Sequence, residues 1–235
     1  MNNVIEMQWK AHHCEVISCR RCPRLVAWRE EVARVKRKAY FKESYWGKPV
    51  PGFGDHGARV MILGLAPGAH GSNRTGRMFT GDASGDFLYP ALYRAGFASQ
   101  QESKHIDDGL ALDDIFITAV CRCAPPGNKP TREEQQTCRP YLLQEMRLLE
   151  NLQGIVALGG IAFAGALNLM QEMYGDYDGK KPQFSYNALY RWQDARVWLL
   201  GAYHPSRQNT QTGRLTKTMF AEVWEGVNRL LEEEK

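Results

Sequence analysis

A histidine stands directly after an apolar run near the end of the chain. His204 follows the run VWLLGAY and precedes a proline and a polar, glycine-containing loop that extends to Leu215. An imidazole changes its charge near neutral pH and often serves as a general acid or base in enzymes. A lone histidine is more often structural, but the turn that Pro205 enforces and the polar loop after it favour a functional role here.

A second polar loop follows another apolar run, at residues 59–66. Its sequence GLAPG at 64–68 predicts a sharp turn, because proline lacks an amide donor and glycine accepts left-handed conformations. Glycines along the loop let backbone amides approach an anion or a planar ligand, and Arg74 and Arg77 add positive charge. A P-loop is excluded because no Gly-Lys-Ser/Thr follows. The alternative is an ordinary turn between a strand and a helix.

The cysteines form two groups that are far apart in the sequence. They stand at positions 14, 19, 22, 121, 123 and 138. Cys19 and Cys22 have the spacing of a metal-binding knuckle, but fourteen residues separate Cys123 from Cys138, which fits a compact zinc ribbon poorly. Four thiolates gathered from distant segments suit an iron–sulfur cluster as well as zinc. The alternative is a set of buried free cysteines, and Cys121, at the end of an apolar run, is expected to be a packed thiol.

The composition is that of a globular protein with a substantial core. The chain has 235 residues, 43% of them hydrophobic, which suits one α/β core with appended segments. Its formal charge of +4 is compatible with a phosphate-bearing partner without requiring one. No apolar run approaches the roughly 20 residues that a membrane helix needs, and the N-terminus lacks the pattern of a secretory signal. We therefore expect a cytoplasmic protein with reduced thiols and no membrane contact.

Four apolar, β-branched runs predict strands that are buried on both faces. They are residues 59–66, 114–120, 154–158 and 197–203. Helical patterns lie at 24–39, 84–96, 131–151, 160–175 and 216–233. The third of these begins with a capping box, in which Thr131 precedes Glu134. Strands alternating with helices indicate an α/β fold with a mostly parallel sheet and helices on both faces. In such sheets the active site lies at the carboxyl ends of the strands, where both polar loops fall.

Five short motifs follow one another along the chain: GLAPG, GRMFTGD, RCAPPGN, TCRPYL and HPS. They resemble the uracil-DNA glycosylase superfamily and, within it, family 5, the b-type enzymes of bacteria and archaea that carry an iron–sulfur cluster. The resemblance runs from Cys19 to about Thr216. It implies a three-layer α/β/α sandwich around a four-stranded, mostly parallel sheet. It also implies a single domain over residues 1–235, with a helical segment at about 1–40 joined to it by the cluster.

The same resemblance implies a cofactor and a partner. The cofactor is a [4Fe–4S] cluster with an architectural role, and the family's ligand motif falls on Cys19, Cys22, Cys123 and Cys138. Zinc is the alternative metal. The partner is DNA that contains uracil or another deaminated base, and one copy of the chain is enough to face a duplex, so we expect a monomer.

The family's reaction is the hydrolysis of an N-glycosidic bond. A base inside the stack cannot be reached, so its nucleotide must first be turned out of the duplex. The family's stacking aromatic falls on Phe79, and the turn after the first strand places backbone groups near the sugar and phosphate. His204 falls where a neutral imidazole donates a hydrogen bond to the departing base, a contact typically worth roughly 3–4 kcal/mol. The substrate-binding residues expected are Gly64, Ala66, Gly68, Phe79 and Ala119.

This sequence departs from the sister families at two positions. Where several of them have a polar or acidic residue that orients the attacking water, this chain has Leu65 and Ala66. Asp82 is our first candidate for that task and Asn128 the second, although Asp82 could equally cap the following helix. Where sister families read uracil with an asparagine, this chain has Ala119. Losing that amide predicts relaxed base specificity and activity on hypoxanthine.

The loop after His204 is expected to enter the minor groove and fill the gap that the extruded nucleotide leaves. Leu215 or Gln211 is the expected wedge, and Arg207 and Arg214 are expected to meet phosphates. The residues predicted to contact DNA are Arg74, Arg77, Ser206, Arg207, Gln211, Arg214 and Leu215.

Two other functions fit parts of the sequence. A non-catalytic iron–sulfur or zinc protein that binds damaged or single-stranded nucleic acid would explain the missing acid in the first motif. A small-molecule enzyme that uses the glycine-rich loop for a phosphate and the cysteines for zinc is the other possibility. It predicts no salt-dependent affinity for DNA, whereas a repair enzyme should lose affinity steeply with salt.

Overall fold

A six-stranded, mostly parallel sheet forms the centre of the molecule in the computed structural model, which describes residues 3–192 and 197–233. Its strands, in spatial order, are β1 (Phe53–Gly54), β3 (Ile115–Ala119), β2 (Val60–Gly64), β4 (Gly154–Leu158), β6 (Val197–Ala202) and β5 (Leu189–Trp192). The four inner strands are parallel, whereas β1 and β5 pair antiparallel at the two edges. The four predicted strands are therefore confirmed, and the expected four-stranded sheet is corrected to six.

The two strands that the sequence pattern missed are both edge strands. β1 has only two residues, and β5 is half-exposed, with the sequence LYRW. Neither carries the continuous apolar run of a strand that is buried on both faces. Each is held by pairing with one neighbour: β1 pairs with β3, which is distant in sequence, and β5 pairs with β6.

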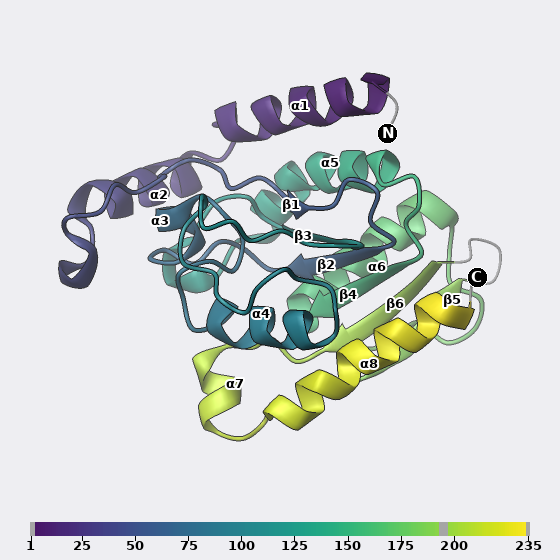
Figure 1. The fold of residues 1–235 in the computed structure, drawn as a ribbon. Helices are drawn as coiled ribbons and strands as arrows, with labels where there is room; N and C mark the ends of the chain where they lie inside the picture. The colour runs from purple at the N-terminus through teal and green to yellow at the C-terminus, as the bar shows by residue number, and fades with distance from the viewer. Residues whose placement is uncertain (1–2, 193–196, 234–235) are drawn as a thin grey trace.

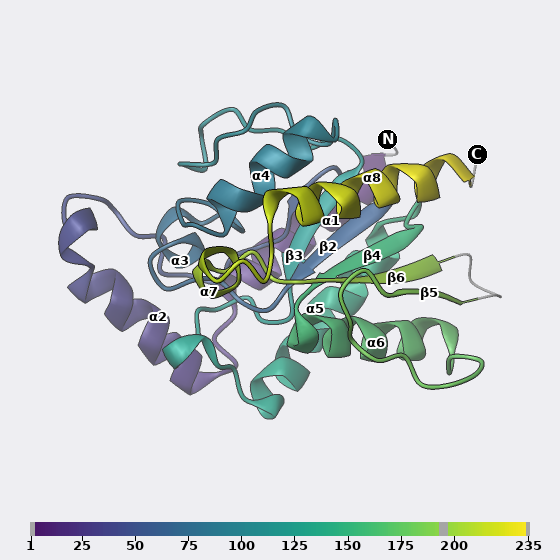
Figure 2. The same cartoon turned by 90° about the horizontal axis from the view of Figure 1, so that it is seen from below.

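Helices cover both faces of the sheet, as the alternation of strands and helices predicts (Figure 2). The helices are α1 (Asn3–Ser18), α2 (Pro23–Val35), α3 (Ser72–Thr75), α4 (Gly85–Arg94), α5 (Arg132–Leu148), α6 (Gly160–Tyr174), α7 (Arg207–Gln211) and α8 (Lys217–Glu233). The predicted capping box is present at α5, where the Glu134 amide donates to Thr131 Oγ1 at 3.2 Å and the Thr131 amide donates to Glu134 Oε2 at 2.7 Å. None of the described helices combines the length and the low polarity needed to cross a bilayer.

Two hydrophobic cores lie on opposite faces of the same strands. Successive side chains of a strand point to opposite faces, so successive residues of each strand belong alternately to one core and to the other. One core, under α4 and α8, contains Ile62, Val156 and Leu200. The other, under α5 and α6, contains Met61, Ile155 and Leu199. Helix α1 packs outside this second layer, against α5.

The carboxyl ends of the four parallel strands meet at one edge of the sheet (Figure 1). Strand β2 ends at Gly64 and β3 at Ala119, and these two residues are register partners. Strand β4 ends at Leu158 and β6 at Ala202, which are also register partners. Helices α2, α3 and α7 lie toward this edge in both views, so segments from the whole chain surround it.

Candidate active site

The aromatic ring of Phe79 packs directly against the end of β2. A Cβ atom placed on Gly64 would lie 2.9 Å from Phe79 Cζ, so only glycine leaves room for the ring. Gly64 pairs with Ala119, which is buried at the end of β3. The structure therefore brings together three of the predicted substrate-binding residues, and the packing explains why the strand must end in glycine.

The backbone of Phe79 has an unusual, left-handed conformation. Its φ is +51°, a region that L residues with bulky side chains rarely occupy because the Cβ atom crowds the carbonyl group. Such a conformation persists only when the surrounding structure enforces it. A Cβ on Gly85 would collide with the Phe79 carbonyl oxygen, and the buried Tyr89 hydroxyl donates to the Met78 carbonyl at 2.8 Å. Helix α4 thus holds the backbone at both Met78 and Phe79 in place.

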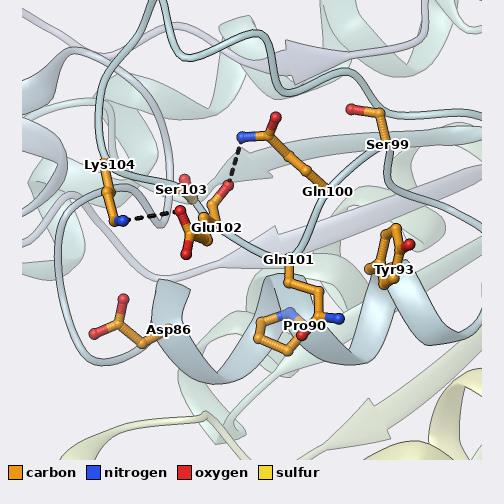
Figure 3. A pocket seen from close by; sticks show the side chains of 9 residues that line it. All are labelled: Asp86, Pro90, Tyr93, Ser99, Gln100, Gln101, Glu102, Ser103 and Lys104. Atoms are coloured by element: carbon orange, nitrogen blue, oxygen red, sulfur yellow. Dashed lines mark hydrogen bonds and ion pairs between the residues drawn. The ribbon is translucent and has the colours of Figure 1, made fainter.

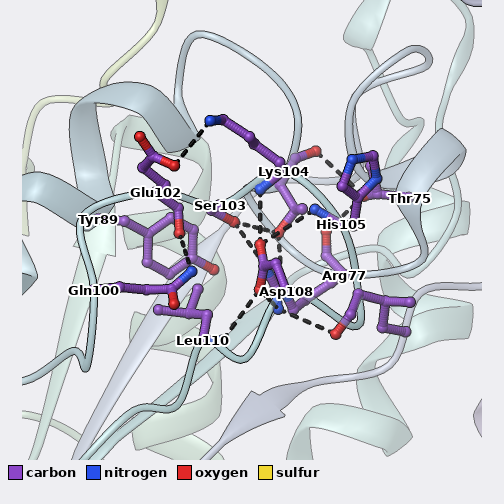
Figure 4. A network of polar contacts seen from close by, with 12 residues as sticks. Thr75, Arg77, Tyr89, Gln100, Glu102, Ser103, Lys104, His105, Asp108 and Leu110 are labelled. Carbon is purple, nitrogen blue, oxygen red and sulfur yellow. Dashed lines mark hydrogen bonds and ion pairs between the residues drawn. The ribbon is translucent and has the colours of Figure 1, made fainter.

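A polar network formed by the residues on either side of Phe79 in the sequence, Arg77 and Thr80, holds this part of the loop (Figure 4). The Arg77 guanidinium, 2% exposed, pairs with Asp108 at 2.7 and 2.8 Å and donates to Thr80 Oγ1 at 2.9 Å and to Ser103 Oγ at 3.1 Å. Asp108 also accepts hydrogen bonds from three backbone amides of residues 104–110. Although burial opposes ionisation, these donors hold the pKa of Asp108 well below its usual value. The prediction that Arg77 contacts DNA is wrong, because its donors are used inside the protein.

Arg74 is likewise a structural residue. Its side chain is 6% exposed, donates to the carbonyl groups of His70 and Gly81 at 2.8 Å each, and forms an ion pair with Glu43. Its guanidinium lies over the Tyr40 ring, 4.0 Å from the ring centroid. The prediction that Arg74 contacts DNA is therefore also wrong. Both errors have one cause: the carboxylates that pair with these arginines are far away in the sequence.

Asp82 holds the turn that begins α4 and also faces the GLAPG turn. Its Oδ1 accepts hydrogen bonds from the Ser84 and Gly85 amides at 3.0 and 3.1 Å, so the structural role that competed with the catalytic one is present. Its Oδ2 lies against Gly68 and Gly71, where a Cβ on Gly71 would collide with it. Burial raises the pKa of Asp82, although the two amide bonds oppose this shift. One oxygen is thus engaged in the turn and the other faces the first motif.

The imidazole of His204 lies beside the ring of Phe79. The ring centroids are 5.9 Å apart and the planes are inclined by 34°, within the range for aromatic rings in contact. Burial lowers the pKa of His204 to about 4, so the ring is neutral at physiological pH. The His204 carbonyl accepts from the Ser206 amide at 2.8 Å and from Asn209 Nδ2 at 2.9 Å. Within the described part of the chain, neither ring nitrogen has a hydrogen-bond partner, so an N–H donor is available to a ligand.

Most side chains of the segment after His204 are at least partly exposed, but Pro205 and Leu215 are buried. Ser206 caps α7 by accepting from the Asn209 amide at 3.4 Å. The exposed side chains include three of the predicted DNA contacts, which are Arg207, Gln211 and Arg214. Leu215, by contrast, is 1% exposed and belongs to the core under α8. The prediction that Leu215 wedges into DNA is wrong, because extracting it would open the core.

Two predicted residues lie at the margin of this arrangement. Ala66 is half-buried and packs against the core on the α5 side of the sheet. Asn128 is exposed in a left-handed turn with φ of +57°, a conformation that asparagine accepts readily. Its amide donates to the Pro125 carbonyl at 3.2 Å. Among the described contacts, none joins Asn128 to His204, Phe79 or Asp82.

The four predicted ligand cysteines line one cavity, although they come from three distant segments. Cys19 and Cys22 precede α2, Cys123 follows β3, and Cys138 lies in α5. The free volume of this cavity is only about 10 Å³, so the side chains that line it lie close together. Among residues 3–192 and 197–233, no group of three or more Cys, His, Asp or Glu side chains is arranged to hold a single metal ion. Four thiols from three distant segments nevertheless meet at one place.

The environment of these cysteines supports bound thiolates. Burial raises the pKa of Cys22, and raises that of Cys123 to about 12, so a positive centre is needed to keep these sulfurs ionised. The buried Arg29 guanidinium donates to Cys123 Sγ at 2.8 Å and to the Cys19 carbonyl at 3.1 Å. No motif of the sequence indicated a role for Arg29. Its position four residues after Leu25, on the buried face of α2, was the signal that could have identified it.

A second buried ion pair joins three layers of the structure. Arg122 and Glu145 are both almost fully buried and pair with each other. Thr118 Oγ1 donates to Glu145 Oε2 at 2.8 Å, and His12 Nε2 lies 3.4 Å from Glu145 Oε1. This network ties α1, β3 and α5 together beside the cysteine cavity, and no motif in the sequence indicated it.

The groove in Figure 3 shares Ser103 with the Arg77 network. It lies along α4 and the segment 99–104, and none of the predicted site residues lines it. Two pairs of its polar groups are engaged with each other, because Lys104 Nζ pairs with Glu102 at 2.8 Å and Gln100 Nε2 donates to the Glu102 carbonyl at 2.9 Å.

Comparisons with known proteins agree with this geometry. The family model described as Uracil DNA glycosylase superfamily matches residues 51–228. The chain is 54% identical to the type-5 uracil-DNA glycosylase of Thermus thermophilus over 213 residues, which cover 91% of this chain and 94% of that protein. It is 51% identical to the type-5 enzyme of Mycobacterium leprae over 219 residues, 93% of each chain. It is also 35% identical to the type-4 uracil-DNA glycosylase of Pyrobaculum aerophilum over 198 residues, 81% of this chain and 90% of that protein.

Proposed function

Because this chain belongs to the uracil-DNA glycosylase superfamily, with type-5 relatives along almost its whole length, we propose that it removes uracil from DNA in base excision repair. The reaction is the hydrolysis of the bond between the base and the deoxyribose. The observation that carries the proposal is the neutral imidazole of His204 beside the Phe79 ring, at the carboxyl ends of the parallel strands.

The target nucleotide must leave the stack before the bond can be reached. The Phe79 and His204 rings are in contact, so a planar base has no room between them. Because Phe79 is only 8% exposed, the base stacks on the small accessible part of this ring, with its edge toward His204. The rigid support of Phe79 suits this role, because a ring held by packing and buried hydrogen bonds loses little further freedom when the base binds.

Bond cleavage leaves negative charge on the departing base. His204 donates a hydrogen bond to the base carbonyl oxygen on which this charge develops. A neutral donor in a desolvated site needs no reorganisation, and such a donor is worth roughly 3–4 kcal/mol. Burial supports the neutral form, since it disfavours the imidazolium ion.

Cleavage also leaves positive charge on the sugar, which water then attacks. The free Oδ2 of Asp82, beside Gly68 and Gly71, is the group that orients this water and favours the cation. The Oδ1 bonds to α4 fix the carboxylate in that orientation. Asn128 is the second candidate for the water.

Base specificity is expected to be relaxed. Ala119 presents no hydrogen-bonding group at the end of β3, so recognition depends on stacking and on the carbonyl that His204 contacts. Hypoxanthine is planar and carries a carbonyl group, and we propose it as a second substrate. Release of uracil alone from a panel of uracil, hypoxanthine and xanthine duplexes would contradict this part.

The cysteines are proposed to hold a [4Fe–4S] cluster through Cys19, Cys22, Cys123 and Cys138. When bound, the cluster cross-links α2, the end of β3 and α5, and it supplies no step of the hydrolysis. Cys123→Ala should lower iron content and the free energy of unfolding, because a metal site that forms only in the folded state contributes to folding. Zinc in place of iron and sulfide, measured by elemental analysis, would overturn the assignment.

The monomer is proposed to face DNA with the exposed segment around α7, where Gln211 fills the gap and Arg207 and Arg214 meet phosphates. The central experiment is single-turnover release of uracil from a duplex, with strand cleavage by alkali as the readout. Tight binding without any alkali-labile site would instead support the non-catalytic alternative. If the protein neither binds nor cleaves the DNA, this result would support the small-molecule enzyme.

A further inference from the structure

A short basic segment follows α2 and is not part of the site described above. Residues 36–42 have the sequence KRKAYFK, with four basic residues in seven. Arg37, Lys38 and Lys42 are exposed, and among the described residues none of them has a carboxylate partner. We name residues 36–42 the basic segment.

Some other exposed basic residues differ from the basic segment because each pairs with a nearby carboxylate. Arg20 pairs with Glu30, Arg34 with Glu31, Lys104 with Glu102 and Arg191 with Glu233. The carboxylate next to the basic segment, Glu43, is taken by the buried Arg74. The repulsion among the four charges is therefore uncompensated within the described structure, and an anionic ligand would relieve it.

The basic segment is anchored to the loop that forms the active site. Arg74 lies over the Tyr40 ring as well as pairing with Glu43. Just beyond the segment, the Trp46 amide donates to the Arg74 carbonyl at 2.9 Å, and the Tyr45 hydroxyl lies 3.1 Å from His70 Nδ1. The same loop continues to Phe79 and Asp82. Both views place α2 and α3 together toward the sheet edge that α7 also borders (Figures 1 and 2).

An exposed aromatic residue completes the surface. Phe41 is 70% exposed and is followed directly by Lys42. Basic side chains interleaved with an accessible aromatic ring are typical of surfaces that bind nucleic acid, with phosphates meeting the charges and a base or sugar meeting the ring. A purely structural turn would not need either feature on its outer side.

We propose that the basic segment is a second DNA-binding surface, which holds the backbone on the opposite side of the extruded nucleotide from Arg207 and Arg214. Arg37, Lys38 and Lys42 contact phosphates, and Phe41 packs against a sugar or an unstacked base. This inference rests on the proposed function for its choice of partner. The proposal accounts for the buried, structural roles of Arg74 and Arg77, because a neighbouring segment supplies the phosphate contacts in their place.

The test is a triple variant, Arg37→Gln with Lys38→Gln and Lys42→Gln, in the complete protein. Its affinity for a duplex with an abasic site, the reaction product, is measured between 50 and 200 mM salt. Losing three phosphate contacts should lower the slope of log Kd against log salt by about 2 to 3, at roughly 0.9 per contact. Affinity at 50 mM salt should fall at least about ten-fold. The rate at saturating DNA should be unchanged, because none of the three residues contacts the base.

The matched control removes three arginines from the other edge of the sheet: Arg94→Gln with Arg147→Gln and Arg229→Gln. These side chains are exposed near the C-terminal ends of α4, α5 and α8, and their loss changes the net charge by the same amount. Equal slopes for the two triple variants would overturn the proposal. Phe41→Ala should weaken binding several-fold with no change in slope, and unchanged binding would remove Phe41 from the surface. Failure of the wild-type protein to release uracil would refute the proposed function instead. The comparison of salt slopes would still show whether the basic segment binds DNA.

Discussion

Two polar loops that follow parallel strands have similar sequences and opposite roles in the structure. The loop at residues 68–82, after β2, and the segment at residues 204–215, after β6, both contain at least one glycine and two arginines. In the first loop, Arg74 and Arg77 are buried and paired with carboxylates. In the second, Arg207 and Arg214 are exposed. The arginines of the first loop shape the site, whereas those of the second are free to meet a ligand.

The difference comes from residues outside both loops. Glu43 and Asp108 pair with the arginines of the first loop, and both arrive from segments that are distant in sequence. Among the described residues, no carboxylate pairs with Arg207, and the Arg214 guanidinium lies 4.7 Å from the centroid of the Tyr203 ring. The role of a basic residue near DNA therefore depends on whether a distant carboxylate takes up its donors.

The largest expected effect is on chemistry, at the start of the second segment. His204→Ala should lower the single-turnover rate of uracil release by about 100-fold or more, the usual loss when one donor to a developing anion is removed. Affinity for DNA should change little, because the exposed arginines remain. A rate within a few-fold of wild type would remove His204 from the mechanism.

Asp82→Asn should have the next largest effect, on the order of 100-fold, if the first loop also carries chemistry. Burial raises the pKa of Asp82 above its ordinary value of 3.8, and the ionised form is the active one. The wild-type rate should therefore fall with decreasing pH earlier than an ordinary aspartate would require. The variant should lack this decrease and stay flat until pH about 4, where His204 becomes protonated. Identical pH profiles for the two proteins would leave Asp82 with only its turn-forming role.

Asp108→Asn tests the structural half of the comparison. Breaking a buried ion pair typically costs about 3–5 kcal/mol, and the free energy of unfolding in urea should fall by an amount at the lower end of this range. The pKa of Asp108 is lower in the folded protein, so its contribution is present above the unfolded-state pKa and is lost as the pH falls below it. The control is Thr75→Ser, which keeps the hydroxyl that donates to the Thr80 carbonyl at 3.2 Å and should leave the stability close to that of wild type. A variant as stable as wild type would mean that the network does not support Phe79.

The smallest effect is expected for the double variant Arg207→Gln and Arg214→Gln. The slope of log Kd against log salt should fall by about 2, with roughly ten-fold weaker binding at low salt. Arg77→Gln should destabilise the protein without this change in slope. If Arg77→Gln lowers the slope as much as the double variant does, the distinction between the two loops is wrong.

Patterns within a few residues identified the strands whose side chains are buried on both faces of the sheet. The inner strands β2, β3, β4 and β6 are buried on both faces, so each leaves a continuous apolar run in the sequence. The edge strands β1 and β5 leave no such run, because pairing with a neighbour holds them. The capping box of α5 was also predictable from a local pattern, since all the atoms that form it belong to residues within four positions of one another.

The sequence by itself determined the α/β class, the order of the inner elements along the chain and the placement of His204 and Gly64 near strand ends, because these follow from patterns a few residues long. The role expected for Phe79 came from the resemblance to the glycosylase family. Only the tertiary structure decided that Arg74 and Arg77 are buried, that Leu215 belongs to the core and that Arg29 faces a cysteine. Those outcomes depend on partners tens of residues away. Burial and charge pairing are properties of the assembled surface, so no single segment contains the information to specify them.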